Sequence, residues 1–122
     1  MRPMHTLIIE TSTEQGVVAI LKDETVLEVS YLPFGYNQSN YLLPHLQSLF
    51  QTSGLTPQQI DAIGVGIGPG SYTGIRIGAA AAKTLAYACR KPLIGISSLE
   101  ALCYRQPVHT LSSCITSCVV QR

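Results

Sequence analysis

Charged residues are scarce in this chain. They make up 12% of its 122 residues, whereas roughly 25% is usual for a soluble domain. Hydrophobic residues make up 46%, so the chain has little polar material with which to cover a globular surface. We therefore expect one domain with apolar surface left over for a partner.

The net charge is also close to zero. Eight lysine and arginine residues against seven acidic residues leave a formal charge of +1, which provides no basic field to attract nucleic acid or an anionic membrane. Tight RNA binding by the chain alone is therefore disfavoured. Ten glycines and seven prolines in a mixed composition fit neither collagen-like repetition nor disorder, so the chain is expected to fold.

Metal and redox motifs are missing as well. The residues that such motifs would need are Cys89, Cys103, Cys114, Cys118, His5, His45 and His109. The cysteines form no CxxC pair and the histidines begin no HxxxH or HExxH motif, so the sequence predicts no metal site. The cysteines are interpreted as free thiols in a reducing compartment. The role of Cys114 and Cys118 stays open, because two thiols four residues apart suit a helix face, a disulfide or neither.

Targeting and membrane segments are not indicated. Residues 1–10 lack the apolar length and cleavage site of a secretory signal. Residues 62–82 reach membrane-spanning length, but several glycines, Pro69 and Arg76 interrupt them. We expect a cytoplasmic protein without a membrane segment.

Three strands are expected first. Residues 5–11 and 17–22 are rich in aliphatic and β-branched side chains and are separated by turn-forming residues. Asp23 and Glu24 form a second tight turn before residues 25–32, where apolar and polar residues alternate imperfectly. These segments predict an antiparallel meander.

Helices and strands then alternate. Leu42, Leu46 and Leu49 have helical spacing and predict a helix that Gly54 ends. Pro44 is expected either to open this helix or to kink its first turn, since a proline deep inside a helix is costly. Thr56, Pro57 and Gln59 match a capping box and predict a short helical turn.

The second half repeats the alternation. Residues 61–68 predict a strand, residues 68–74 a loop and residues 75–89 an alanine-rich helix. A strand at residues 93–96 and a helix from Ser97 or Ser98 to Tyr104 follow. The resulting order, βββαβαβα, indicates an α/β domain with a mixed sheet covered by helices.

The glycine-rich loop has two interpretations. Gly68, Gly70 and Ser71 precede a helix and could present backbone N–H groups to a phosphate. The loop fails the Walker, GxGxxG and GxSxG patterns, so close packing of the helix on the strand is favoured instead.

The helix that follows carries a ridge of small residues four apart, namely Gly74, Gly78, Ala82 and Ala86. Such a ridge allows another helix to approach closely, and we infer a partner helix from another copy or another protein. Packing against Leu42, Leu46 and Leu49 is the alternative. Arg76 and Lys83 are the charges on this helix before Arg90, and Arg76 could pair with a carboxylate across an interface.

The turn after the first strand is the best polar cluster. Glu10, Thr11 and Ser12 resemble the turn that contacts phosphate in actin-like ATPases, where Asp, Gly and Thr are needed. Here the carboxylate is longer and the glycine arrives only at Gly16. Turn chemistry is therefore favoured over catalysis.

Three motifs together carry a family resemblance. Residues 7–13 (LIIETST), residues 39–44 (SNYLLP) and above all residues 66–78 (GIGPGSYTGIRIG) resemble the TsaB family, also called YeaZ. The resemblance covers roughly residues 6–104. It implies an actin-like (ASKHA, ribonuclease H-like) fold for residues 1–105.

The family is the non-catalytic accessory subunit in making threonylcarbamoyladenosine in tRNA. The resemblance implies that residues 39–52 and 73–89 form a helical bundle with the catalytic subunit TsaD, in a complex with the ATPase TsaE. That complex modifies the adenosine beside the anticodon of tRNAs reading ANN codons. It also implies no catalytic residue, no cofactor, tRNA contact only through the complex, and self-pairing through the same surface. The expected interface residues are Leu42, Leu46, Leu49, Gly74, Arg76, Gly78, Ala82, Lys83 and Ala86.

The chain also departs from the family. Family members usually have Asp where Glu10 stands and often His where Gln38 stands. They continue into a second actin-like domain, whereas residues 106–122 match nothing expected and look like the tail of a truncated or frameshifted product. Two alternatives therefore stay open: an ATP-binding half-domain of an actin-like ATPase or sugar kinase, and a self-assembling, non-functional fragment.

Overall fold

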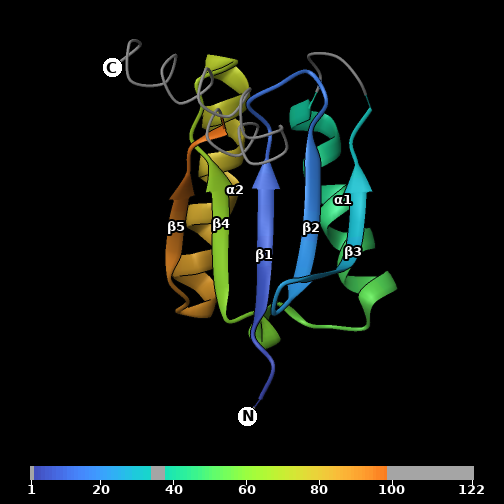
Figure 1. Cartoon of the computed structure of the whole chain (residues 1–122). Coiled ribbons are helices and arrows are strands. Elements are labelled where there is room, and N and C mark those ends of the chain that lie inside the picture. The colour runs from blue at the N-terminus through green and yellow to red at the C-terminus, as the bar shows by residue number, and fades with distance from the viewer. Residues whose placement is uncertain (1, 34–37, 99–122) are drawn as a thin grey trace, which may run out of the picture.

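The computed structural model describes residues 2–33 and 38–98. Its elements, shown in Figure 1, are β1 (His5–Glu10), β2 (Val17–Lys22), β3 (Thr25–Tyr31), α1 (Gln38–Ser53), the short 3-10 helix η1 (Pro57–Gln59), β4 (Ala62–Gly66), α2 (Tyr72–Cys89) and β5 (Leu93–Ile96). The expected order is confirmed as far as β5. The helix expected after β5 lies outside the described residues except for Ser97 and Ser98, and residues 106–122 lie outside them as well.

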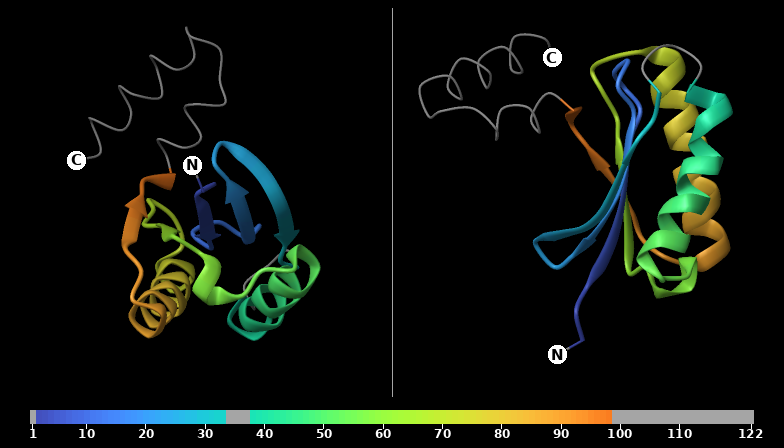
Figure 2. Two further views of the ribbon diagram at one scale, coloured as in Figure 1. Left: turned by 90° about the horizontal axis from the view of Figure 1, so that it is seen from below. Right: turned by 90° about the vertical axis from the view of Figure 1, so that its right-hand side faces the viewer.

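The strands form one mixed sheet in the order β3-β2-β1-β4-β5. β1, β2 and β3 pair antiparallel, whereas β4 pairs parallel with both β1 and β5. Both α1 and α2 lie on the same face of this sheet (Figure 2). The predicted meander and the parallel crossovers are therefore confirmed.

The core lies between the sheet and the two helices. Alternate residues of the central strands are buried there because successive side chains of a strand point to opposite faces. The sheet contributes Leu7, Ile9, Val18, Ile20, Ile63 and Val65, and the helices contribute Leu42, Leu46, Leu49, Ala82 and Ala86.

A register shift explains the imperfect alternation in β3. Ile20 pairs with Glu28 and Leu21 pairs with Val26, so Leu27 has no pairing partner in β2. An extra residue of this kind moves the following side chains to the other face of the strand. Val29 therefore lies on the same face as Val26, although they are three residues apart.

Pro44 lies in the interior of α1, six residues after the helix begins. The expectation that Pro44 opens the helix or kinks its first turn is wrong. A proline removes the hydrogen bond to the carbonyl four residues earlier. Asn40 and Pro44 are both exposed, so water can satisfy that carbonyl.

α2 begins three residues earlier than the pattern of residues 75–89 indicates. Ser71 is its N-cap, and the Ser71 side chain accepts a hydrogen bond from the Gly74 N–H at 3.1 Å. Arg90 ends the helix in the left-handed conformation, with φ at 56°. The expected capping turn at η1 is present, because the Gln59 side chain accepts from the Thr56 N–H at 2.8 Å.

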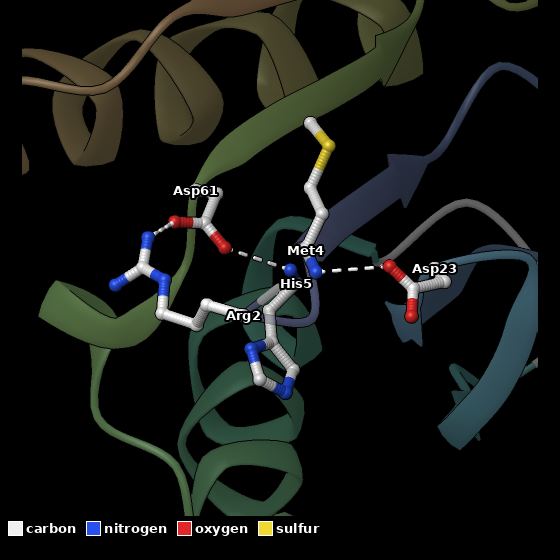
Figure 3. Close-up of polar contacts among 5 residues, drawn as sticks. All are labelled: Arg2, Met4, His5, Asp23 and Asp61. Atoms are coloured by element: carbon white, nitrogen blue, oxygen red, sulfur yellow. Dashed lines mark hydrogen bonds and ion pairs between the residues drawn. The ribbon is translucent and has the colours of Figure 1, made fainter.

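Two carboxylates hold the amino end of β1 (Figure 3). Asp61 accepts a hydrogen bond from the His5 N–H at 2.8 Å and pairs with Arg2, and Asp23 accepts from the Met4 N–H at 3.0 Å. The His5 N–H is the main cause that lowers the pKa of Asp61, and Arg2 adds to it against partial desolvation. These contacts fix the start of β1 between β2 and β4.

No helix within residues 2–33 and 38–98 combines the length and hydrophobicity needed to cross a membrane.

Candidate partner interface

The predicted partner ridge on α2 faces the sheet of its own chain. Gly74, Gly78, Ala82 and Ala86 are its buried residues, and Ala82 is 0% exposed. A Cβ on Gly78 would overlap Thr11 Oγ1 and lie 3.5 Å from Ile9 Cγ2. The small residues therefore let α2 approach the end of β1, and the inference that a partner helix packs on this ridge is corrected.

The three leucines of the predicted interface are also internal. Leu42, Leu46 and Leu49 are at most 4% exposed and belong to the core. The reason is that α1 has one apolar stripe, and the sheet already covers it. These leucines therefore pack in the core between α1 and the sheet.

The outer side of the helical layer is open instead. A groove between α1 and α2 is lined by Ser39, Leu42, Leu43, Ile77, Ala80, Ala81, Thr84 and Leu85. We use "outer groove" below for the part of it that Leu43, Ile77, Ala80, Ala81 and Thr84 form. Leu43 is 67% exposed, which makes it more exposed than the other large apolar side chains of this groove.

Small residues also line the outer groove. Ala80 and Thr84 are spaced by four residues along α2 and are both exposed. The Thr84 hydroxyl donates to the Ala80 carbonyl at 2.8 Å, so it needs no partner of its own. This second ridge of small residues allows a helix of another chain to approach closely. Its four-residue spacing was visible in the sequence, beside the spacing of the buried ridge.

The helical layer carries positive charge and no carboxylate. α1 contains no charged residue, and α2 contains Arg76 and Lys83, both exposed. The Arg76 guanidinium lies over the Tyr72 ring at 5.4 Å from its centroid. These two predicted interface residues are placed where a partner's acidic side chains can reach them.

The turn after β1 lies at the carboxyl end of this strand, opposite the end that Asp61 binds, and its side chains connect neighbouring segments there. Glu10 Oε1 accepts hydrogen bonds from the Ser12 N–H, at 2.8 Å, and from the Ser12 hydroxyl. Glu10 Oε2 accepts from the Ser98 hydroxyl at 2.8 Å. A Cβ on Gly66 would overlap this carboxylate, so the glycine of β4 makes room for it.

The glycine loop is bound to the same turn. The Ser71 N–H donates to the Ser12 carbonyl at 2.6 Å, and the Gly68 N–H donates to Ser98 Oγ at 3.2 Å. A Cβ on Gly70 would overlap the Ser12 carbonyl oxygen. The Gly68 and Ser71 N–H groups, which a phosphate would need, therefore have partners inside the chain, and this favours the close-packing interpretation of Gly68, Gly70 and Ser71.

Ionisable side chains do not gather elsewhere in the part of the chain that the structure describes. Within residues 2–33 and 38–98, no three His, Cys, Asp or Glu side chains are grouped so as to hold a metal ion. Cys89 is a half-buried free thiol on α2. Cys103, Cys114, Cys118 and His109 lie outside the described residues.

Comparisons with known proteins agree with this architecture. The sequence model of the TsaD family, described as tRNA N6-adenosine threonylcarbamoyltransferase, matches residues 36–117. The tRNA threonylcarbamoyladenosine biosynthesis protein TsaB of Bacillus subtilis is 39% identical over 81% of this chain and 43% of its own length. TsaB of Escherichia coli is 40% identical over 81% of this chain and 42% of its own length.

A solved structure has a similar fold. YeaZ from Pseudomonas aeruginosa superposes with a TM-score of 0.78 at 32% identity, over 84% of this chain and 47% of that one. The actin-like α/β fold is therefore confirmed. The chain spans less than half the length of these relatives. By the family model and these relatives together, the chain belongs to the TsaD-related family of actin-like proteins and, within it, to the TsaB (YeaZ) group.

Proposed function

We propose that this chain is a non-catalytic accessory subunit in tRNA threonylcarbamoyladenosine biosynthesis, which binds and activates a TsaD-type transferase through the outer groove. The carrying observation is the exposed apolar groove between α1 and α2, with Leu43 67% exposed on its rim. The assignment to tRNA threonylcarbamoyladenosine biosynthesis rests on the relatives named TsaB.

The outer groove suits a helical partner. On the α2 side the groove is lined by the small side chains of Ala80, Ala81 and Thr84. On the α1 side it is lined by the larger side chain of Leu43. An amphipathic helix docks into such a groove with apolar side chains at helical spacing. Arg76 and Lys83 select a partner helix with acidic residues at its border, because the two helices that form the groove carry no negative charge.

A non-catalytic role fits the polar turn. Both oxygens of Glu10 accept hydrogen bonds from Ser12 or Ser98, and Thr11 Oγ1 donates to the Gly74 carbonyl at 2.6 Å. These groups stabilise the fold at the place where an actin-like ATPase would handle phosphate. We therefore assign the transfer chemistry and ATP use to other subunits of the complex, the TsaD and TsaE types, with tRNA contacted only through the assembly.

Self-pairing competes with partner binding in this account. The outer groove of a second copy offers the same apolar surface, so a homodimer that exchanges for a heterodimer is expected. A fragment that pairs only with itself is the competing interpretation.

The test is the mass in solution of the chain alone and mixed with a purified TsaD-type transferase, measured by light scattering. We expect a one-to-one heterodimer, which Ala80→Arg abolishes and Thr25→Arg, at an exposed residue at the start of β3, leaves intact. A parent chain that stays a homodimer in the presence of the transferase would instead support the non-functional fragment.

A further inference from the structure

The exposed side of α2 has a symmetric sequence. Tyr72 and Tyr87 lie at its two ends and are 73% and 90% exposed. Arg76 follows the first tyrosine by four residues, Lys83 precedes the second by four, and both charged side chains are exposed. Two alanines lie midway between the charges. In either direction, this side of α2 therefore presents a tyrosine, a cation, two alanines, a cation and a tyrosine.

The two cations lie beside the outer groove. Arg76 and Lys83 are seven residues apart, which is close to two helical turns, so they lie on the same side of α2. A hollow of about 400 Å³ around Arg76 shares Ile77 and Ala80 with the outer groove. Along the helix axis, Ala80 is about 6 Å from Arg76 and about 4.5 Å from Lys83 at 1.5 Å per residue. A helix that packs on Ala80 is therefore within reach of both cations.

Neither cation has an ion-pair partner among residues 2–33 and 38–98, where the ion pair joins Arg2 and Asp61. The Arg76 guanidinium contacts the Tyr72 ring instead, at 5.4 Å from the ring centroid. α1 and α2 contain no Asp or Glu. These two helices therefore present positive charge alone to a chain that packs on them.

A second copy of the chain meets these cations with its own. In a two-fold pair whose antiparallel α2 helices cross between Ala79 and Ala80, the symmetric spacing places Arg76 opposite Lys83 of the second copy. In a parallel two-fold pair, each residue lies opposite itself. Both arrangements bring together two cations from each copy, and α1 and α2 supply no carboxylate between them. Like charges in an interface repel, which opposes self-pairing.

We propose that Arg76 and Lys83 select the occupant of the outer groove: they oppose a second copy of this chain and favour a helix of another protein that carries carboxylates opposite them. This selection rests on the proposed function, because both effects need the outer groove as the partner surface. A carboxylate of the partner helix pairs with Arg76, whose guanidinium is already held over the Tyr72 ring.

Salt then shifts the choice between the two assemblies. It screens the repulsion in the homodimer and the attraction in the heterodimer, because the Debye length is about 30 Å at 0.01 M and about 3 Å at 1 M ionic strength. The homodimer is therefore strengthened by salt, and the heterodimer is weakened by it.

Sedimentation velocity of the full chain at about 0.02 M and about 0.5 M NaCl measures self-pairing. We expect the Kd of the parent homodimer to be lower by about fivefold at the higher salt concentration. Arg76→Gln and Lys83→Gln should each tighten the homodimer at low salt and reduce its response to salt. Lys22→Gln is the matched control, since it removes a charge at the exposed last residue of β2, and it should behave as the parent chain does.

Titration calorimetry with a purified TsaD-type transferase measures the heterodimer at the same two salt concentrations. We expect the affinity of the parent chain to fall with salt. Arg76→Gln should lower the affinity by about tenfold at low salt and flatten its salt dependence. Lys22→Gln should change neither, and a melting curve checks that each variant is folded.

Two results would overturn the proposal. The first is self-pairing that weakens with salt, or that both Arg76→Gln and Lys83→Gln leave unchanged. The second is a heterodimer whose affinity neither of these variants changes. In the second case, Ala80→Arg separates the selection from the proposed function. Loss of binding in Ala80→Arg would keep the outer groove as the partner surface without selection by charge, whereas full affinity would contradict the proposed function itself.

Discussion

Thr11 and Gly74 join the end of β1 to the first turn of α2. The Thr11 hydroxyl donates to the Gly74 carbonyl at 2.6 Å, and a Cβ on Gly74 would overlap the Thr11 carbonyl oxygen. The two backbones are therefore in direct contact, which only glycine at position 74 allows. The long motif around this residue maintains a strand-to-helix junction inside the chain.

Gly74→Ala is expected to destabilise the chain. In an unobstructed helix the same change stabilises by about 1 kcal/mol. Here the new methyl group meets a backbone oxygen that cannot rotate away, so we expect a net loss of about 1–3 kcal/mol, as for other overpacked sites. Urea unfolding followed by circular dichroism measures it.

Thr73→Ala provides the control for this change, since Thr73 is the exposed neighbour of Gly74 in α2. It should leave the unfolding midpoint nearly unchanged. A stabilised Gly74→Ala variant would contradict the close contact with Thr11.

Ala82→Arg should abolish folding, whereas Ala80→Arg should preserve it. Ala82 is 0% exposed and packs in the core, and an uncompensated buried charge costs about 3–5 kcal/mol. Ala80, two residues away on the same helix, is exposed. Circular dichroism and a melting curve for both variants check the prediction, and two equally stable variants would contradict the assignment of inner and outer faces of α2.

Glu10 and Ser98 are expected to be energetically coupled. Glu10→Gln removes one acceptor oxygen from a carboxylate that binds Ser12 and Ser98, and Ser98→Ala removes one donor to it. Groups in one hydrogen-bond network usually couple by about 0.5–3 kcal/mol. A double-mutant cycle by urea unfolding measures the coupling, and additive effects would show that the two side chains act independently.

Stability should fall in acid partly through Asp61. Its pKa is lowered in the folded chain from an ordinary value of 3.8, first by the His5 N–H. Such a group contributes stability above its ordinary pKa, and the contribution disappears as the pH falls through the lower folded value. The melting temperature of the parent chain should therefore drop on acidification below about pH 4, and that of Asp61→Asn should drop less. Equal drops in both would contradict this role.

Much of the fold could be predicted from the sequence, because local patterns determine it. The spacing of Leu42, Leu46 and Leu49 predicted α1, and the capping residues at 56–59 predicted η1. Pro44 was misjudged, since its cost depends on whether the carbonyl it leaves unpaired faces water.

The interface was harder to predict, because periodicity does not say which side of a helix meets the sheet. α2 carries two small-residue ridges, one through Gly78 and Ala82 and one through Ala80 and Thr84. The spacing alone predicts the first ridge as the partner surface, but the close approach of Thr11 to α2 requires it inside the chain. Leu43, which widens the stripe of α1, was the signal for the outer groove.

The affinity of the chain for a TsaD-type transferase tests the central claim most directly. Titration calorimetry would compare the parent chain with Ala80→Arg, after a melting curve has shown that the variant is folded. Because the arginine fills the middle of the outer groove, we predict an affinity lower by about 100-fold or more, which corresponds to about 2.7 kcal/mol. An unchanged affinity in a folded Ala80→Arg variant would contradict the assignment of the outer groove as the partner surface.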